Sequence, residues 1–296
     1  MKGRARYWIG YSLAAVFCLS VLAPILWMAL SSIQTERDLL TIPPEWIPSR
    51  PTLDNYTYVF RGIIPSSFEE RGAVRSLVSQ EVRQIPPGLR NSTIVALAVM
   101  VINLLLGGIA AYTFTRLKFR GREPAYMFVL ASRLLPPVAV AIPVYIVVQK
   151  MALLDRYPAL ILVHAAFTLP FTIWYLSSYI RNIPNEYEEA ALTEGCSWLQ
   201  AFLYIVVPLA GPGLVAIATF AFMFSYNEFL FALLLSQTIR VRTMPVVVAL
   251  ISVNPDVAYS LLSVGVIVSI IPPIVLAILM RKYILSGLVS SLSVTK

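Results

Sequence analysis

Long apolar runs alternate with short charged stretches along the chain. A helix needs about 20 mostly apolar residues to cross the roughly 30 Å of hydrocarbon in a bilayer. Six windows have that length, and they cover residues 7–30, 91–115, 124–149, 157–180, 199–225 and 257–280. The pattern therefore predicts six transmembrane helices, the third interrupted by Arg133.

Two further features of the pattern refine this topology. The apolar stretch 244–253 has ten residues, so it is predicted to be a short helix outside the membrane or dipping into it. The first window follows a basic start, as a signal peptide does. Its 24 residues exceed the roughly 7–15 of a signal-peptide core, so we interpret it as an uncleaved span.

Composition supports a membrane protein. The chain is 58% hydrophobic and only 13% charged, with a mean hydropathy of +0.76, whereas about 25% of residues are charged in soluble domains. The net charge of +8 does not indicate nucleic acid, because no basic helix with interleaved aromatic residues occurs.

The distribution of basic residues predicts the orientation, because short cytoplasmic loops are enriched in Lys and Arg. With a cytoplasmic N-terminus, eleven basic residues lie on that side: Lys2, Arg4, Arg6, Arg116, Lys118, Arg120, Arg122, Arg181, Arg281, Lys282 and Lys296. The opposite short loops hold Lys150, Arg156, Arg240 and Arg242. Both termini are therefore expected in the cytoplasm.

Prolines are concentrated inside the predicted spans, among them Pro136, Pro137, Pro143, Pro170, Pro208, Pro212, Pro272 and Pro273. Each removes a backbone hydrogen bond, which a bilayer tolerates only where neighbouring helices or a water-filled cavity satisfy the freed carbonyl. Kinks in four spans suit a bundle that encloses a pathway, although proline is also commoner in membrane helices in general. The two cysteines, Cys18 and Cys196, are predicted to lie too far apart for a disulfide and have no metal-site partners.

The external segment 31–90 is the largest piece outside the membrane. Its residues 68–83 are predicted to form one amphipathic helix. The segment lacks His, Cys and any recognisable catalytic carboxylate pair, so it is expected to dock a neighbouring protein, to shield a pathway, or to serve packing alone.

A cytoplasmic segment between the fourth and fifth windows is the most informative. Asn185 and Glu188 are spaced as an N-terminal capping pair, and Gly195 is predicted to end the helix. Ser197 and Gln200 are spaced as a second capping box that begins the next helix.

The predicted surface helix is strongly acidic. It holds four carboxylates and no basic residue: Glu186, Glu188, Glu189 and Glu194. Its Tyr187, Ala190, Ala191 and Glu194 share one face at helical spacing. We expect this face to bind a basic cleft on another protein; the alternative is an ordinary connecting helix.

The segment 188–213 resembles the EAA signature of binding-protein-dependent ABC importers: Glu-Ala-Ala, three residues, Gly, nine residues, then Ile-x-Leu-Pro. The residues in register are Glu189, Ala190, Ala191, Gly195, Ile205 and Pro208. Val207 replaces the leucine, and Glu194 stands where the family usually has Asp. The segments "SYNEFLFALLLS" and "SRLLPPVAVAIPVYIVV" resemble the second permease subunit of maltose-type systems, and the likeness extends from residue 91 to the C-terminus.

The resemblance implies an all-α fold of six transmembrane helices in the type I ABC importer permease arrangement. Residues 1–30 would hold the tail and first span, 31–90 the external loop, 91–285 the permease domain and 286–296 a cytoplasmic tail. The tail departs from the family by lacking its second glycine. Coupling residues carried over from the motif and its flanks are Glu188, Glu189, Ala190, Ala191, Glu194, Gly195 and Pro208.

The resemblance further implies a bacterial inner-membrane subunit that is not itself an enzyme and holds no cofactor or metal. Its implied partners are a second permease subunit, two ATP-binding subunits, an extracytoplasmic solute-binding protein, a sugar-like substrate and membrane lipid. The loop 236–255 would touch the binding protein. The chain contains no phosphate-binding loop of its own, so ATP is expected to be hydrolysed by a partner.

Four residues are candidates for the solute pathway: Arg133, Tyr226, Asn227 and Glu228. Arg133 would bind solute hydroxyls or a carboxylate, or, as we favour, would snorkel or bond carbonyls freed by nearby prolines. The others would form an aromatic and polar platform for a sugar, or an interfacial anchor. His164 is predicted to be a core histidine rather than a proton carrier.

Two rival classes of protein lack their expected residues. An ion-coupled secondary transporter of a small solute needs paired intramembrane carboxylates or broken-helix ion sites, and no core of a predicted span contains Asp or Glu. A membrane-embedded enzyme needs a polar catalytic cluster, which one His and one Arg do not make.

Overall fold

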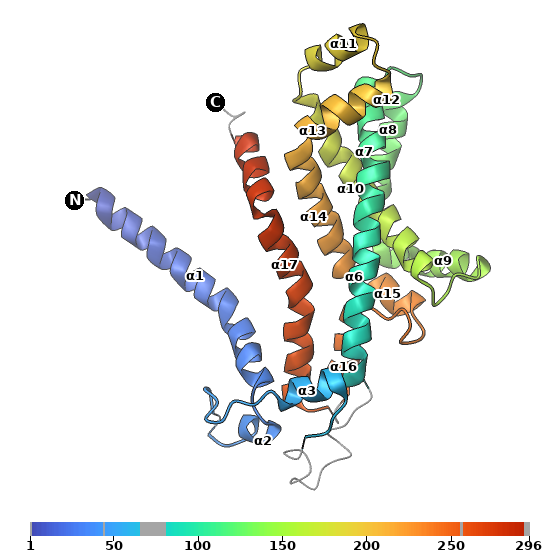
Figure 1. The fold of residues 1–296 in the computed structure, drawn as a ribbon. Helices are drawn as coiled ribbons and strands as arrows, with labels where there is room; N and C mark the ends of the chain where they lie inside the picture. Colours follow the sequence, from blue (N-terminus) through green and yellow to red (C-terminus); the bar gives the residue numbers. More distant parts are fainter. Residues whose placement is uncertain (1, 44, 66–80, 255–256, 293–296) are drawn as a thin grey trace. The chain divides into compact units, whose positions relative to one another are not determined.

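The computed structural model describes residues 2–43, 45–65, 81–254 and 257–292, and the regular elements in these ranges are helices (Figure 1). The chain forms two compact units, Met1–Pro86 with Val247–Ile271, and Pro87–Val246 with Pro272–Lys296. The first unit thus combines the N-terminal part of the chain with residues 247–271.

Among the described residues, four continuous helical stretches are long and apolar enough to cross a membrane: Gly10–Ser32, Val82–Arg116, Tyr157–Arg181 and Tyr259–Lys282. They belong to α1 (Lys2–Ser32), to α6 (Ile85–Ile102) with α7 (Gly108–Arg116), to α10 (Tyr157–Arg181) and to α17 (Tyr259–Leu292). A π-helical segment, Asn103–Gly107, joins α6 to α7. The first, second, fourth and sixth predicted windows are thus continuous helices, and the last continues into the expected tail.

The third and fifth windows are not continuous helices. In the third, α8 (Arg122–Ala131) and the 3-10 turn Ser132–Leu134 meet α9 (Pro137–Lys150) at 101°. The break follows from two consecutive prolines, because Pro136 and Pro137 offer no N–H and force the preceding residue into extended backbone. Each bent pair still counts as one candidate span, which gives up to six.

The fifth window breaks at Ala210. Before it lie α12 (Trp198–Ala201), a π-helical segment (Phe202–Val206) and α13 (Val207–Leu209); after it lies α14 (Gly211–Tyr226). The two arms meet at 82°. Pro212, near the start of α14, suits a helix beginning but not a helix interior.

The shorter helices are α2 (Glu36–Leu39), α3 (Asp54–Arg61), α11 (Glu186–Thr193), α15 (Leu230–Leu235) and α16 (Met244–Val253). The prediction of a short helix over 244–253 is confirmed by α16. The amphipathic helix predicted over 68–83 lies mostly outside the described residues, and its described end joins the 3-10 turn Val82–Gln84.

The first unit is held together partly by polar side chains. The carboxylate of Glu36 accepts the backbone N–H groups of Tyr259 at 3.0 Å and of Ser260 at 2.9 Å. An acid at this place stabilises the positive N-terminal end of α17. Asn55 donates to the carbonyls of Ser32 at 3.0 Å and Gln34 at 2.8 Å. These bonds connect α2 to α17 and α3 to α1 within this unit.

In the second unit, α7, α10 and α14 pack around a core that includes Tyr112, Leu176, Ile180, Phe202 and Ile217. A buried polar network adds specificity: Asn103 donates to Thr168 Oγ1 at 2.7 Å and accepts from Thr172 Oγ1 at 2.7 Å. Within this unit, α11 and α12 lie at one end of α7 and α10, and α15 lies towards the other (Figure 1).

Candidate functional site

The acidic helix α11 begins differently from the prediction. The expected capping pair of Asn185 and Glu188 does not form: Asn185 has helical φ −67° and ψ −25°, and its side chain makes no capping hydrogen bond. Glu188 is turned to the interior and is only 3% exposed. Because its carboxylate is bound elsewhere, it is unavailable to the start of the helix.

The end of α11 follows the prediction. Gly195 has φ +94°, and its N–H donates to Leu192 O at 3.1 Å while Cys196 N–H donates to Ala191 O at 3.0 Å. These two bonds make a Schellman motif, which needs a left-handed residue that glycine supplies without strain. The helix therefore ends in a sharp corner at Gly195.

The second capping box is confirmed. Gln200 N–H donates to Ser197 Oγ at 3.3 Å, and Ser197 N–H donates to Gln200 Oε1 at 2.7 Å. The box begins α12 directly after the Gly195 corner. Further along the same arm, Pro208 lies exposed in α13, just before the break at Ala210.

One face of α11 is exposed to solvent. It carries Tyr187, which is 56% exposed, with Glu189, Ala190 and Glu194. Glu186 is also exposed, so three of the four carboxylates face outward, while Ala191 and Glu188 are buried. We call Tyr187, Glu189, Ala190 and Glu194 the acidic face.

The inner side of α11 is bound by an ion pair that the sequence did not indicate. Arg116 Nε lies 2.7 Å from Glu188 Oε1, and Tyr112 donates its hydroxyl to Glu188 Oε2 at 3.0 Å. In the sequence, Arg116 is one of several basic residues in a short loop. Its position there indicates only how the chain is oriented in the membrane. The fold brings it to Glu188 from the end of α7.

Arg133 lies in the 3-10 turn at the break between α8 and α9. It is exposed, and its guanidinium carbon lies 4.6 Å from the centre of the Phe171 ring, a cation–π contact. Phe171 in turn packs against Phe220 with ring centres 4.2 Å apart. The contacts from Arg133 to Phe171 and from Phe171 to Phe220 therefore form a line of side chains from the turn after α8 to α14.

A hollow of about 370 Å³ lies at the end of that line, lined by Phe220, Met223, Phe224, Asn227 and Glu228. Tyr226 does not line it, since it is 2% exposed and stacks on Phe222 with centres 5.6 Å apart. The aromatic rings beside Asn227 and Glu228 are therefore Phe220 and Phe224. Their helical spacing from those polar residues is the signal that would have found them.

His164 has partners that the sequence did not indicate. It is 1% exposed; its Nδ1 lies 2.8 Å from Ser225 Oγ, and its Nε2 lies 3.1 Å from Glu228 Oε2, without hydrogen-bond alignment. Glu228 also accepts the N–H groups of Phe231 at 2.9 Å and Ala232 at 3.0 Å. The carboxylate is thus engaged with its own chain on both oxygens.

A third group of side chains anchors the loop between α15 and α16. Asp155 Oδ1 accepts the N–H groups of Gln237 at 2.9 Å and Thr238 at 2.8 Å. Burial raises the pKa of the Asp155 carboxyl, but the bonds from Thr238 and Gln237 and the Arg240 charge outweigh it, so the pKa lies below its usual range.

Two residues of α6 hold the rest of this loop. Asn91 donates to the carbonyls of Ile239 at 3.2 Å and Arg242 at 2.9 Å, and Ser92 Oγ accepts Met244 N–H at 2.7 Å. We call residues 236–244 the anchored loop. Its residues 237–240 are exposed on a fixed backbone.

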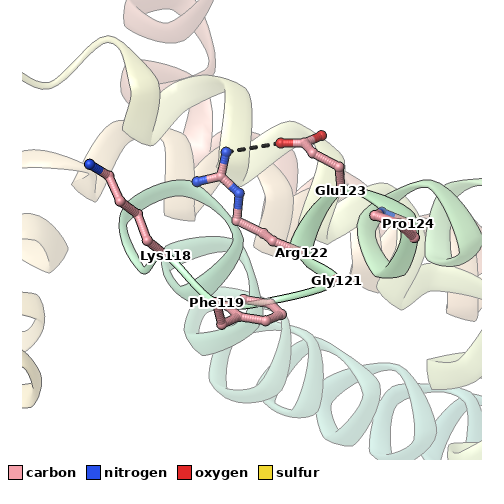
Figure 2. Close-up of a pocket in the computed structure, with 6 residues that line it drawn as sticks. All are labelled: Lys118, Phe119, Gly121, Arg122, Glu123 and Pro124. Carbon is pink, nitrogen blue, oxygen red and sulfur yellow. Dashed lines mark hydrogen bonds and ion pairs between the residues drawn. The ribbon is translucent and has the colours of Figure 1, made fainter.

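The turn between α7 and α8 forms an open hollow of about 410 Å³, lined by Lys118, Phe119, Gly121, Arg122, Glu123 and Pro124 (Figure 2). Arg122 and Glu123 form a surface ion pair at 2.9 Å there. Among the described residues, no group of three or more His, Cys, Asp or Glu side chains is placed to hold a metal.

Several helices long and apolar enough to cross a membrane, together with the exposed acidic helix α11 at one end of α7 and α10, are features of a polytopic membrane protein. Residues 103–290 match the family described as the inner membrane component of binding-protein-dependent transport systems, and the chain belongs to that family. The resemblance seen in the sequence is thereby confirmed. The chain is a permease subunit of an ABC importer, which excludes the ion-coupled alternative.

Individual relatives agree with this assignment. The chain is 31% identical to the trehalose/maltose transport system permease protein MalG of Thermococcus litoralis, over 95% of this chain and 93% of the relative. It is 32% identical to the trehalose transport system permease protein SugB of Mycobacterium tuberculosis, over 97% of each.

A solved structure shares the fold. It is described as the crystal structure of a bacterial ABC transporter involved in the import of the acidic polysaccharide alginate. The TM-score is 0.76 at 20% identity, over 96% of this chain and 98% of that one.

Proposed function

We propose that this chain and a second, different permease subunit form the pathway of a sugar importer that two ATP-binding subunits drive. The acidic face of α11 is the observation that carries the proposal. It presents Tyr187, Glu189, Ala190 and Glu194 to solvent, and their side chains have no hydrogen-bond or ion-pair partner among the residues that the structure describes. Acidic side chains beside a small alanine suit close docking in a basic groove of an ATP-binding subunit.

In this mechanism ATP is hydrolysed by the partner, and this chain transmits motion. Closure of the ATP-binding subunits pushes α11, and the push reaches α12 through Gly195 and α14 through the break at Ala210. The spans then rock between inward and outward openings, a rigid-body change of the kind seen in domain closure.

The orientation follows from charge. Basic residues collect around the loops at the α11 end of the second unit: Arg116, Lys118, Arg120, Arg122 and Arg181. The positive-inside rule places that end, and both termini, in the cytoplasm of a bacterial inner membrane. The anchored loop then faces outward, where its exposed residues 237–240 offer a fixed surface to a solute-binding protein.

A sugar is the substrate class that the relatives and the hollow support. The two relatives named above are trehalose or maltose permeases. Phe220 and Phe224 offer aromatic faces on which a sugar ring stacks, and Asn227 offers an amide to its hydroxyls. The line from Arg133 through Phe171 to Phe220 continues this surface across the unit.

The test uses the complete transporter, purified through a tag on this chain and reconstituted in liposomes with its solute-binding protein outside and ATP inside. We expect the ATP-binding subunit to co-purify and radiolabelled trehalose to accumulate. Glu189→Lys should reduce accumulation and ATP-binding-subunit recovery without preventing membrane insertion, because it reverses a charge on the docking face.

Glu123→Lys is the matched control, since Glu123 is an exposed acid of the same chain away from α11, with a side chain 62% exposed. It should retain both properties. The docking assignment is wrong if Glu189→Lys behaves like this control, and the importer mechanism is wrong if the chain alone carries trehalose into liposomes.

A further inference from the structure

The ion pair beneath α11 binds more segments than an ordinary surface pair. Glu188 uses both carboxylate oxygens, one for Arg116 and one for Tyr112. Arg116 and Tyr112 are one helical turn apart on α7, so both reach the same carboxylate from one face. The side chains of Arg116 and Glu188 are only 10% and 3% exposed.

Arg116 also binds the end of α10. Its Nη2 donates to Ile183 O at 2.6 Å and to Ile180 O at 3.1 Å. These carbonyls belong to the C-terminal turn of α10 and its extension, where the negative end of the helix dipole favours a cation. One guanidinium therefore joins the end of α7, the end of α10 and the first turn of α11.

Tyr112 also links this group of residues to the chain segment that follows α11 and α12. Its ring packs against Phe202 in the π-helical segment after α12, with ring centres 4.9 Å apart. Tyr112, Ile180, Ile183 and Phe202 belong to one buried core. The base of α11 thus rests on the core that unites the cytoplasmic ends of α7 and α10 with the π-helical segment.

The two ends of α11 are held very differently. At Gly195 the chain turns through a left-handed residue, and a Cβ placed there would meet nothing within 4 Å. At Glu188 the helix is held by two directional bonds to α7. Stability alone does not need charge here, because apolar side chains of similar volume often stabilise a buried site as well as an ion pair.

We infer that Arg116 and Tyr112 are positioning residues for coupling: they bind Glu188 so that α11 moves as one rigid body with α7 and α10. The inference rests on the proposed function and adds a second route for the motion, besides the one through Gly195. On this route a displacement of α11 reaches two membrane spans directly. The planar fork of arginine serves carboxylate and carbonyls together, which lysine cannot do.

The experiment measures whether α11 and α10 move together. Two spin labels are placed in the full reconstituted complex at exposed positions outside the acidic face, Thr193→Cys on α11 and Leu162→Cys on α10, with Cys18 and Cys196 replaced by Ser. Thr193 is exposed, and Leu162 is 52% exposed. The distance distribution is recorded by electron paramagnetic resonance without nucleotide and with ATP and vanadate.

In the complex without further substitutions, the distance should be narrow and the same in both states. Arg116→Lys and Tyr112→Phe should broaden it and make it shift when ATP and vanadate are added, and ATP hydrolysis should persist while trehalose uptake falls. Arg122→Lys is the matched control, because Arg122 pairs with Glu123 at the surface; it should leave the distribution unchanged.

The inference is overturned if the distance already shifts with nucleotide in the unsubstituted complex, or if Arg116→Lys and Tyr112→Phe match the control. Tyr112→Phe removes only a hydroxyl, so it tests the idea even if Arg116→Lys does not fold. A failure of the proposed function looks different, since the ATP-binding subunit would then be missing from the unsubstituted preparation itself.

Discussion

His164 Nε2 lies 3.1 Å from Glu228 Oε2, and this contact links α10 to a residue two positions before α15. The same carboxylate accepts two backbone N–H groups at the start of α15. Glu228 therefore has a structural role, whatever it contributes to a solute pathway. The side chain of its neighbour Asn227 donates to the carbonyl of Met223, in its own helical turn, and remains exposed.

Glu228→Ala is expected to lower the free energy of unfolding by about 2 kcal/mol, because two backbone N–H groups lose their acceptor and His164 loses the carboxylate beside it. Asn227→Ala should change it by no more than about 0.5 kcal/mol. Thermal unfolding of both variants in the same detergent distinguishes them. Equal melting temperatures would show that Glu228 is not a structural acceptor.

The stabilisation of the anchored loop by Asp155 should depend on pH only under acidic conditions. The folded pKa of Asp155 lies below its ordinary value of about 3.9, so its stabilising contribution is complete above that value and is lost as the pH falls through the folded pKa. Hydrogen exchange of residues 236–244 should be faster in Asp155→Ala than in wild type, by the same factor at pH 5 and pH 7. A factor that falls between pH 7 and pH 5 would contradict the lowered pKa.

Gly213 allows α14 to approach α10 closely. A Cβ at this position would lie 2.7 Å from two atoms of the Tyr179 ring, so Gly213→Ala should destabilise the protein by about 1–3 kcal/mol. Gly211→Ala is the control in the same helix, because nothing lies within 4 Å of its added Cβ. Thermal unfolding should show a loss for Gly213→Ala alone, and a loss of equal size in both would refute the close approach.

Two glycines have left-handed backbone and open surroundings, Gly195 with φ +94° and Gly121 with φ +86°. Alanine at either should cost about 1–2 kcal/mol of backbone strain. Only Gly195→Ala should also lower the recovery of the ATP-binding subunit in pull-downs, since only it alters the corner at α11. Equal recovery from the two variants would show that the corner at Gly195 does not contribute to docking.

Local sequence patterns predicted much of the fold. The window 157–180 corresponds to α10, the stretch 244–253 to α16, and Ser197 with Gln200 to a capping box, because each depends on neighbours in sequence. The sharp breaks were only partly visible, since proline predicts a kink but not its angle. Whether two arms bend by 101° or remain one kinked helix depends on tertiary packing.

The exposed residues of the candidate site could be predicted from the sequence, whereas the contacts of its buried residues could not. The acidic residues of α11 and the Gly195 corner follow from spacing, whereas the inward turn of Glu188 depends on Arg116, which lies 72 residues earlier. A capping bond and a buried ion pair compete for the same carboxylate, and a single sequence does not show which prevails. The burial of Tyr226 has the same origin, because its partners are set by helix packing.

The break at Ala210 makes the arm Trp198–Leu209 a lever that stands nearly perpendicular to α14. Twelve residues at about 1.5 Å each make an arm of roughly 18 Å, set at 82° to α14. A rotation of only 10° about the break would carry the far end of such an arm through about 3 Å. An angular change too small to disturb the packing at Ala210 would thus become a displacement comparable to the width of an atom at the Gly195 end.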